Sequence, residues 1–385
     1  MLRLFFAVIA AALVLAAPAV AKVAPGPDGV AFYSPTGAVP NKHGTPIWQR
    51  KLTGPAVLTS AKTNTLLLYS STSTAGKPVA VSGDVAVPKG KPPKGGWPVI
   101  TWAHGTTGIA DACAPSIIGT VYDSPLLNRW LKAGYAVVRT DYEGLGTPAE
   151  PHPYLIGVSE GRSVLDMVRA ARRLDPRLGK RIVIAGHSQG GHAALWAASL
   201  AKKWTPELKL EGTLALAPAS HIGDQAELLS ALSEPNPLSG LAAMIIRGAD
   251  IAKPSLGIPN LLSDEAKALY PQIDTKCISD LSKPDSFGAI APANLLRAGV
   301  DTSGIVAELN ANDPETLKIP GKIQIEQGKA DDTVLPSFTD SLVGEYGKKH
   351  LAVTYKTYPG VNHVGAVTGG KPAADATKFV KRRLG

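Results

Sequence analysis

The 385-residue sequence contains only two cysteines, Cys113 and Cys277, and no Cys-x-x-Cys motif. No His, Cys, Asp or Glu residues stand at metal-ligand spacing, so we expect no metal and no cofactor. Its 40 Lys and Arg against 31 Asp and Glu give a net charge of +9, but the short basic clusters lack interleaved aromatic residues. We therefore expect no nucleic-acid partner and interpret the lysines as solvated.

Beyond the N-terminus, the sequence also lacks any apolar run long enough to span a membrane. Residues 1–21 combine a positive start at Arg3, an apolar run from Leu4 to Ala17, and small residues before Lys22. This pattern predicts a cleavable secretory signal peptide rather than a retained anchor, and a secreted protein, extracellular or periplasmic. Export favours a disulfide between the two cysteines over two unpaired buried thiols.

The remaining composition, 44% hydrophobic and 18% charged, is typical of a globular protein with a well-formed core. Strand-like runs alternate with helix-like segments, which predicts a mostly parallel sheet with helices on both faces. Strand signals vanish between residues 221 and 315, so we expect a helical cap or lid inserted into a core of residues 22–220 and 316–385. Residues 22–60, rich in Gly, Pro and Lys, predict an irregular N-terminal arm laid over that core.

The sequence from Gly186 to Gly190, Gly-His-Ser-Gln-Gly, follows a buried strand and precedes an Ala/Leu-rich helical segment. Gly-x-Ser-x-Gly in a strand–turn–helix context is typical of a nucleophile elbow, where glycines let strand and helix nearly touch. This predicts Ser188 as a catalytic nucleophile at a helix N-terminus. An ordinary turn between strand and helix is the alternative.

A serine nucleophile needs a histidine base to take its proton. In folds with such an elbow, the chain order is the serine, then the acid, then the histidine. His363 lies in a loop after a strand at residues 352–358. The other candidates are placed less favourably, since His192 lies in the helix after the elbow, His350 in a Lys-rich turn, and His221 at the start of the cap. We therefore predict His363 as the base.

The acid that orients this base is predicted from the strand at residues 322–327. Asp331 stands three residues after Gly328, where the strand turns out, and Asp332 would point to the opposite side. We therefore favour Asp331 over Asp332, and a structural turn acid remains as the alternative.

An oxyanion hole requires two backbone N–H donors. We expect them from Gln189, directly after the nucleophile, and from Thr106 in the loop at residues 104–108. A simple strand-terminating turn is the alternative for that loop. Asp141, at another strand end, could shape the pocket or form a buried structural hydrogen bond, and we favour the structural interpretation. No residues are assigned to substrate binding.

With these residues the chain resembles the secretory lipase family of α/β-hydrolases, over nearly the whole mature sequence. The resembling segments are Trp102-Ala-His-Gly-Thr-Thr-Gly108, Thr140-Asp-Tyr-Glu-Gly-Leu-Gly146, His152-Pro-Tyr-Leu155, Gly186-His-Ser-Gln-Gly-Gly191, Gly328-Lys-Ala-Asp331 and Gly360-Val-Asn-His363. The resemblance implies an α/β-hydrolase fold and a Ser/Asp/His ester hydrolase with a helical cap. Because members differ most in the cap, acyl-length preference does not carry over.

We therefore expect a secreted carboxylic ester hydrolase, a lipase or carboxylesterase, that forms an acyl-enzyme with a small-molecule or lipid ester. Short and medium acyl chains are predicted as substrates. The alternatives are an acyltransferase or peptidase with the same triad, or a catalytically dead hydrolase-fold binding protein. Contact with a lipid interface is left open, and we expect a monomer.

Overall fold

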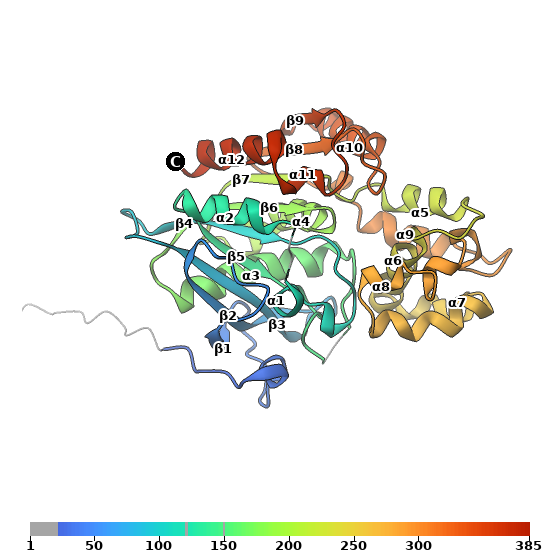
Figure 1. Ribbon diagram of the computed structural model, residues 1–385, viewed down its shortest axis with the longest axis horizontal. Helices are drawn as coiled ribbons and strands as arrows, with labels where there is room; N and C mark the ends of the chain where they lie inside the picture. The colour runs from blue at the N-terminus through green and yellow to red at the C-terminus, as the bar shows by residue number, and fades with distance from the viewer. Residues whose placement is uncertain (1–21, 120–121, 149–150) are drawn as a thin grey trace, which may run out of the picture.

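A nine-stranded sheet forms the body of the protein (Figure 1). The computed structural model describes residues 22–119, 122–148 and 151–385, so the predicted signal peptide (residues 1–21) lies outside the described residues. In these ranges no helix is both long and apolar enough to cross a membrane. The strands are β1 (Pro46–Lys51), β2 (Ala61–Thr72), β3 (Pro78–Pro88), β4 (Trp97–Ala103), β5 (Ala136–Thr140), β6 (Leu178–His187), β7 (Lys209–Leu216), β8 (Lys322–Gly328) and β9 (Ala352–Tyr358).

The strands lie in the order β1-β2-β3-β5-β4-β6-β7-β8-β9. The pairs from β1 to β5 are antiparallel, and every pair from β5 through β4 to β9 is parallel. The mostly parallel sheet predicted from the sequence is therefore confirmed. Because the parallel strands share a direction, their carboxyl ends meet at one edge, where sites in such sheets form.

Helices cover both faces of this sheet. The α-helices are α1 (Pro115–Ile118), α2 (Ser124–Lys132), α3 (Gly157–Leu174), α4 (Gln189–Trp204), α5 (Ile222–Ser230), α6 (Leu238–Ala252), α7 (Asp264–Leu269), α8 (Ile278–Leu281), α9 (Ser303–Ala311), α10 (Pro336–Lys348), α11 (Gly365–Thr368) and α12 (Gly370–Leu384). Short 3₁₀ turns occur at Gly29–Tyr33, Asp111–Cys113, Pro254–Leu256, Ile258–Asn260, Tyr270–Asp274, Phe287–Ala289, Pro292–Asn294 and Pro314–Thr316.

The central strands are apolar throughout because both of their faces are buried. In β6, Ile182 and Ile184 pack with α3 and α4, whereas Val183 and Ala185 pack on the opposite face with α2 and α12. Successive side chains of a strand point to opposite faces, so a strand covered on both sides reads as a continuous apolar run. This explains why the elbow strand was recognisable from its sequence.

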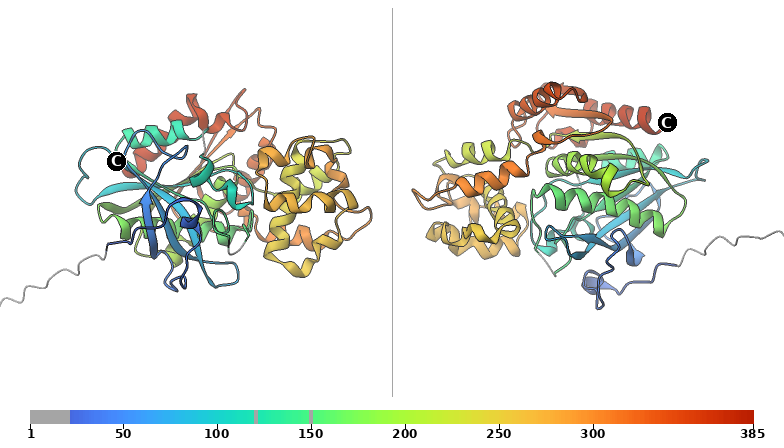
Figure 2. Two further views of the ribbon diagram at one scale, coloured as in Figure 1. Left: turned by 60° about the horizontal axis from the view of Figure 1, so that its bottom comes forward. Right: turned by 180° about the vertical axis from the view of Figure 1, so that it is seen from behind.

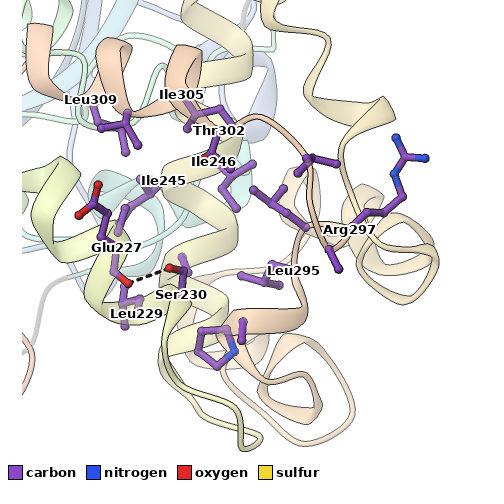
Figure 3. Close-up of a pocket in the computed structure, with 18 of the residues that line it drawn as sticks. Glu227, Leu229, Ser230, Ile245, Ile246, Leu295, Arg297, Thr302, Ile305 and Leu309 are labelled. Carbon is purple, nitrogen blue, oxygen red and sulfur yellow. Dashed lines mark hydrogen bonds between the residues drawn. The ribbon is translucent and has the colours of Figure 1, made fainter.

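The segment between β7 and β8 forms a separate helical lobe, the cap (Figures 1 and 2). Helices α5 to α9 pack around their own apolar cluster, which Tyr154 and Leu155 of the body join. Helices α5, α6 and α9, together with the chain at residues 292–302, line a cavity of about 280 Å³ (Figure 3).

The N-terminal arm is more ordered than its composition predicted. Residues 46–51 are not irregular but form β1, an edge strand paired with β2. An edge strand is held by backbone hydrogen bonds on one side, so it needs no strong apolar pattern.

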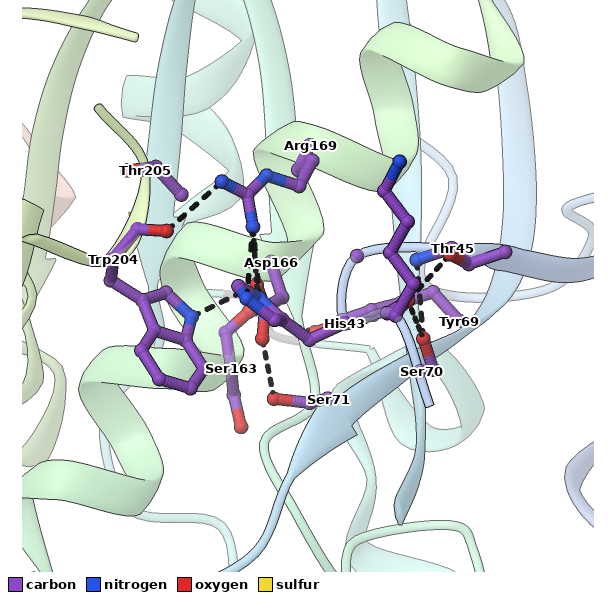
Figure 4. Close-up of polar contacts among 12 residues, drawn as sticks. His43, Thr45, Tyr69, Ser70, Ser71, Ser163, Asp166, Arg169, Trp204 and Thr205 are labelled. Atoms are coloured by element: carbon purple, nitrogen blue, oxygen red, sulfur yellow. Dashed lines mark hydrogen bonds and ion pairs between the residues drawn. The ribbon is translucent and has the colours of Figure 1, made fainter. Parts of the chain in front are cut away.

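The arm is also tied to the body at Asp166 of α3, which is 2.6 Å from Nδ1 of His43 (Figure 4). Asp166 accepts further hydrogen bonds from Ser71 and Trp204.

The predicted disulfide is confirmed. Cys113 and Cys277 are bonded, with their Cα atoms 5.5 Å apart. Cys113 lies in the loop after β4, and Cys277 directly precedes α8 in the cap. The bond therefore fastens the cap to the body beside the carboxyl end of β4.

Replacing both cysteines, Cys113→Ala with Cys277→Ala, should lower the free energy of unfolding by about 2–5 kcal/mol, since the bond closes a long loop. The two positions are 164 residues apart. Urea denaturation of the variant and of the wild type, each with and without reductant, measures the effect. Reductant should lower the stability of the wild type only, and equal stability of all samples would contradict the prediction.

Candidate active site

The candidate nucleophile Ser188 lies between the end of β6 and the start of α4. Its backbone has φ 58° and ψ −122°, a conformation that residues other than glycine rarely adopt. Such strain persists only where the surrounding structure enforces it, and it concentrates at functional sites. The Ser188 side chain is partly exposed at the carboxyl edge of the sheet, while both neighbouring residues are buried.

Close backbone contacts enforce this conformation. A Cβ atom at Gly186 would lie well inside 3.0 Å of the Gly190 carbonyl, and one at Gly190 would lie equally close to the Ala103 carbonyl of β4. A Cβ at Gly191 would lie 2.7 Å from Cα of Pro218. Real Cβ atoms do not approach backbone this closely, so the three glycines allow α4 to start against β4 and the end of β7.

His363 and Asp331 are joined by a hydrogen bond, with Nδ1 of His363 2.8 Å from Oδ2 of Asp331. Because an ionised carboxylate only accepts hydrogen bonds, Nδ1 carries the proton and Nε2 is left as the basic nitrogen. Oδ1 of Asp331 also accepts from the N–H groups of Thr333 (3.0 Å) and Val334 (2.9 Å). Asp332 is exposed and makes no contact with His363.

The surroundings of Asp331 keep it ionised. Burial alone would raise the pKa of this carboxyl, but the hydrogen bond and charge of His363 and the two backbone N–H donors outweigh burial and lower the pKa. A carboxylate that remains charged holds the imidazole in one tautomer and stabilises it when it becomes protonated.

Ser188 and His363 line the same cavity, which has a volume of about 270 Å³. No hydrogen bond joins their side chains among the described residues. Nucleophile–base hydrogen bonds are often long without substrate and shorten in the reacting complex. The structure thus brings the three side chains selected from the sequence to one region, where His363 contacts Asp331 directly and lines the same cavity as Ser188.

The three histidines that were weighed as alternative bases lie away from this contact. His192 is buried against α3, and His350 is exposed. His221 begins the cap, where it contacts Asp224 and Glu315. His187, in the elbow itself, is 3.0 Å from the His363 carbonyl through Nε2, and burial followed by the nearby His363 lowers its pKa to about 3.

The two expected oxyanion donors flank the elbow. Gln189 is the first residue of α4, where N–H groups have no partner within the helix. Thr106 lines the cavity, and its hydroxyl is 2.6 Å from that of Tyr154. No acceptor for the N–H of either residue occurs in the part of the chain that the structure describes. Both N–H groups are therefore without a hydrogen-bond partner among the described residues.

Several residues around the site were not identified from the sequence. Tyr154 belongs to a segment that carried the family resemblance, but no role was assigned to it. Glu160 gave no signal, because it lies in an amphipathic helix where an acidic residue is ordinary; it contacts the side chains of Gln189 and His192.

Among the described residues no group of three or more His, Cys, Asp or Glu is arranged to hold a metal ion. Asp141 is buried and accepts from Ser82 and Ser116, in agreement with the structural interpretation.

The sheet order, the elbow and the inserted helical lobe define an α/β-hydrolase. Residues 114–374 match the family model described as "Secretory lipase". The chain therefore belongs to the secretory lipase family and is a carboxylic ester hydrolase, either a lipase or an esterase.

The chain is also similar in sequence to individual proteins that are named as lipases. The chain is 26% identical to "Lipase A" of Moesziomyces aphidis, covering 93% of this chain and 81% of the relative. It is 28% identical to a "Probable inactive lipase" of Mycobacterium tuberculosis, over 55% of this chain and 49% of the relative.

Solved structures share the fold. Candida antarctica lipase A in its closed state superposes with a TM-score of 0.70 at 23% identity, covering 83% of this chain and 78% of that chain. A rice cell wall degrading esterase, LipA of Xanthomonas oryzae, superposes with a TM-score of 0.73 at 18% identity, covering 89% and 99%. At these identities the likeness establishes the fold alone.

Gly190→Ala should lower ester hydrolysis by more than about 100-fold, because the added methyl group displaces α4 from β4 and shifts the site by the order of 1 Å. Gly344→Ala is the matched control, since it lies in α10 with open space around its Cβ position. The control should keep full activity. Measured rates that are equal for the two variants would show that the close contact at Gly190 is not required.

Acid should destabilise the protein through His187. Its pKa in the folded state is about 3, below the ordinary 6.5, so the unfolded chain binds the proton more readily as the pH falls from 6.5 to 3. The stability of the wild type relative to His187→Asn should therefore decrease across this window. Chemical denaturation of the two proteins at several pH values measures this difference, and a difference that stays constant across the window would contradict the prediction.

Proposed function

We propose that the protein is a secreted lipase or esterase in which Ser188 is the nucleophile, His363 the general base and Asp331 the orienting acid. The observation that carries this proposal is that His363, which is hydrogen-bonded to Asp331, lines the same cavity as the strained Ser188. A relative called "Secreted triacylglycerol lipase" in Malassezia furfur supports secretion and lipid esters as substrates. The pattern of residues 1–21 supports export independently.

In the proposed reaction, Nε2 of His363 takes the proton of the Ser188 hydroxyl as Oγ attacks the ester carbonyl. The negative charge on the carbonyl oxygen is stabilised by the N–H groups of Gln189 and Thr106. His363 then gives the proton to the leaving alkoxide, which departs as the alcohol and leaves an acyl-enzyme. Water, deprotonated by His363, releases the carboxylic acid and restores the Ser188 hydroxyl.

The cavity lining supports an uncharged, apolar substrate. No Asp, Glu, Lys or Arg occurs among the described residues that line it. Its wall towards the cap is mostly apolar, with Leu238, Leu241, Ile245 and Ile278 beside the uncharged Gln225 and Ser282. A peptidase that binds a free amine needs an acidic group in this position, so the lining favours ester hydrolysis over peptide cleavage.

The second candidate function is that of a binding protein with a hydrolase fold that has lost its activity, because one relative is named a probable inactive lipase. The arrangement of Ser188, His363 and Asp331 argues against it here. A fluorophosphonate probe tests the question directly, since it labels an activated serine covalently. We expect labelling of the wild type and none of Ser188→Ala; an unlabelled wild type would contradict the proposed function.

The two neighbouring aspartates allow a matched test of the acid. Asp331→Asn should lower kcat for p-nitrophenyl butyrate by about 10³–10⁴-fold, since the histidine loses its orienting carboxylate. Asp332→Asn should change kcat by less than about threefold, as exposed substitutions usually have small effects. Equal decreases of kcat in both variants would contradict the assignment of Asp331 as the orienting acid.

Acyl-chain length should depend on Ile245 of α6. This side chain is buried and lines both the cavity at Ser188 and the cavity within the cap. Figure 3 shows it in the wall of the cavity within the cap. We expect the wild type to prefer short and medium chains. Ile245→Ala should connect the two cavities and shift the preference towards longer chains, as measured with p-nitrophenyl esters from acetate to palmitate. Ile251→Ala, which lies on the same helix outside both linings, is the control and should leave the preference unchanged.

A further inference from the structure

Behind the elbow lies a buried carboxylate that the proposed reaction does not use. Glu160 of α3 has no exposed surface. Its Oε1 accepts hydrogen bonds from the N–H of Leu155 (3.1 Å) and from the side-chain amide of Gln189 (2.8 Å). Its Oε2 accepts from Nδ1 of His192, at 2.7 Å. Glu160 thus contacts the residue after the nucleophile but does not line the cavity.

The Gln189 side chain is fixed in one direction by these contacts. Its amide nitrogen is also 2.9 Å from Nε2 of His152, which accepts because Nδ1 of His152 donates to the Glu143 carbonyl (2.7 Å). Both amide protons of Gln189 are therefore used. The reversed amide would place its oxygen against the Glu160 carboxylate, which is repulsive.

The same network reaches the cap. His192 of α4 donates through Nε2 to the Asn312 carbonyl at 2.8 Å, and Asn312 directly follows α9 where the cap returns to the body. The side-chain oxygen of Asn312 accepts from the N–H of Gly157 at the start of α3. Since both nitrogens of His192 face acceptors, the imidazole carries both protons and forms a buried ion pair with Glu160.

The charges around His192 support this protonation state. Burial alone would lower the pKa of His192, but the Glu160 carboxylate, the Asn312 carbonyl and the nearby Asp313 outweigh burial and raise it. A buried carboxylate left without this partner would be costly, so the pair holds α3, α4 and the returning chain in one arrangement.

We propose that Glu160 is a positioning residue, which fixes the side chain of Gln189 and so aims the N–H of Gln189 at the oxyanion. Through His192 and Asn312 it also links that N–H to the position of the cap. The inference rests on the proposed function, because it assigns a role in the same reaction. Loss of one oxyanion donor lowers kcat by about 10²–10³-fold in serine hydrolases. An N–H of Gln189 that is present but wrongly aimed should therefore lower kcat by about 10–100-fold.

Two substitutions at one position separate this role from simple packing. Glu160→Met keeps the approximate size but removes every acceptor. Glu160→Gln keeps an acceptor for Gln189 and Leu155, and its amide can donate to Nδ1 of a neutral His192. For each protein, fluorophosphonate titration counts the active sites, and kcat and KM for p-nitrophenyl butyrate are expressed per titrated site.

We expect Glu160→Met to lower kcat per titrated site by about 10–100-fold with KM within about threefold, and Glu160→Gln to restore kcat to within about threefold of the wild type. If Glu160→Met does not fold, Gln189→Met carries the test, because it removes the amide contacts while the ion pair of Glu160 and His192 stays. It should lower kcat per site to the same extent.

Fewer titratable sites with an unchanged kcat per site would show that Glu160 only supports folding, and would overturn the inference. The same holds if Glu160→Gln loses as much kcat as Glu160→Met. A wild type that the probe does not label would instead contradict the proposed function, and the inference would fall with it.

Discussion

The site depends on one steric constraint, the contact between the first turn of α4 and the end of β4. Because Gly186, Gly190 and Ala103 approach one another without intervening side chains, the chain turns from strand to helix at a single residue. That residue, Ser188, is forced to a positive φ of 58°. The same turn places its hydroxyl beside the N-terminus of a helix, where unpaired N–H groups favour developing negative charge. The proposed nucleophile and one proposed oxyanion donor thus depend on the same packing contact.

Around this contact, two buried carboxylates each accept a hydrogen bond from a histidine. Asp331 accepts from His363 at the front of Ser188, and Glu160 accepts from His192 behind it. Each pair joins segments distant in sequence, so the positions of the catalytic groups depend on the assembled sheet rather than on local turns. The cap is fastened to this frame by the disulfide beside β4 and by Asn312 behind α4. Its apolar helices close the cavity over the proposed nucleophile.

The features predictable from the sequence were those encoded locally. The elbow glycines, the apolar central strands and the aspartate that follows Gly328 each occupy a few consecutive residues, and these give the sheet and the three candidate side chains. The edge strand β1 was missed because backbone pairing with β2 forms it, without a strong apolar pattern of its own. Glu160 was missed for a related reason: its partners belong to α4, and only helix packing brings them together.

The central claim is that Ser188 carries the acyl group during turnover. It is tested most directly by quenching the reaction with p-nitrophenyl butyrate in acid, digesting the protein, and locating the acyl adduct by mass spectrometry. The account predicts one butyryl group on the peptide that contains Ser188, formed together with a burst of p-nitrophenol. Hydrolysis that proceeds with the adduct on another residue, or with no covalent adduct at any time, would contradict it.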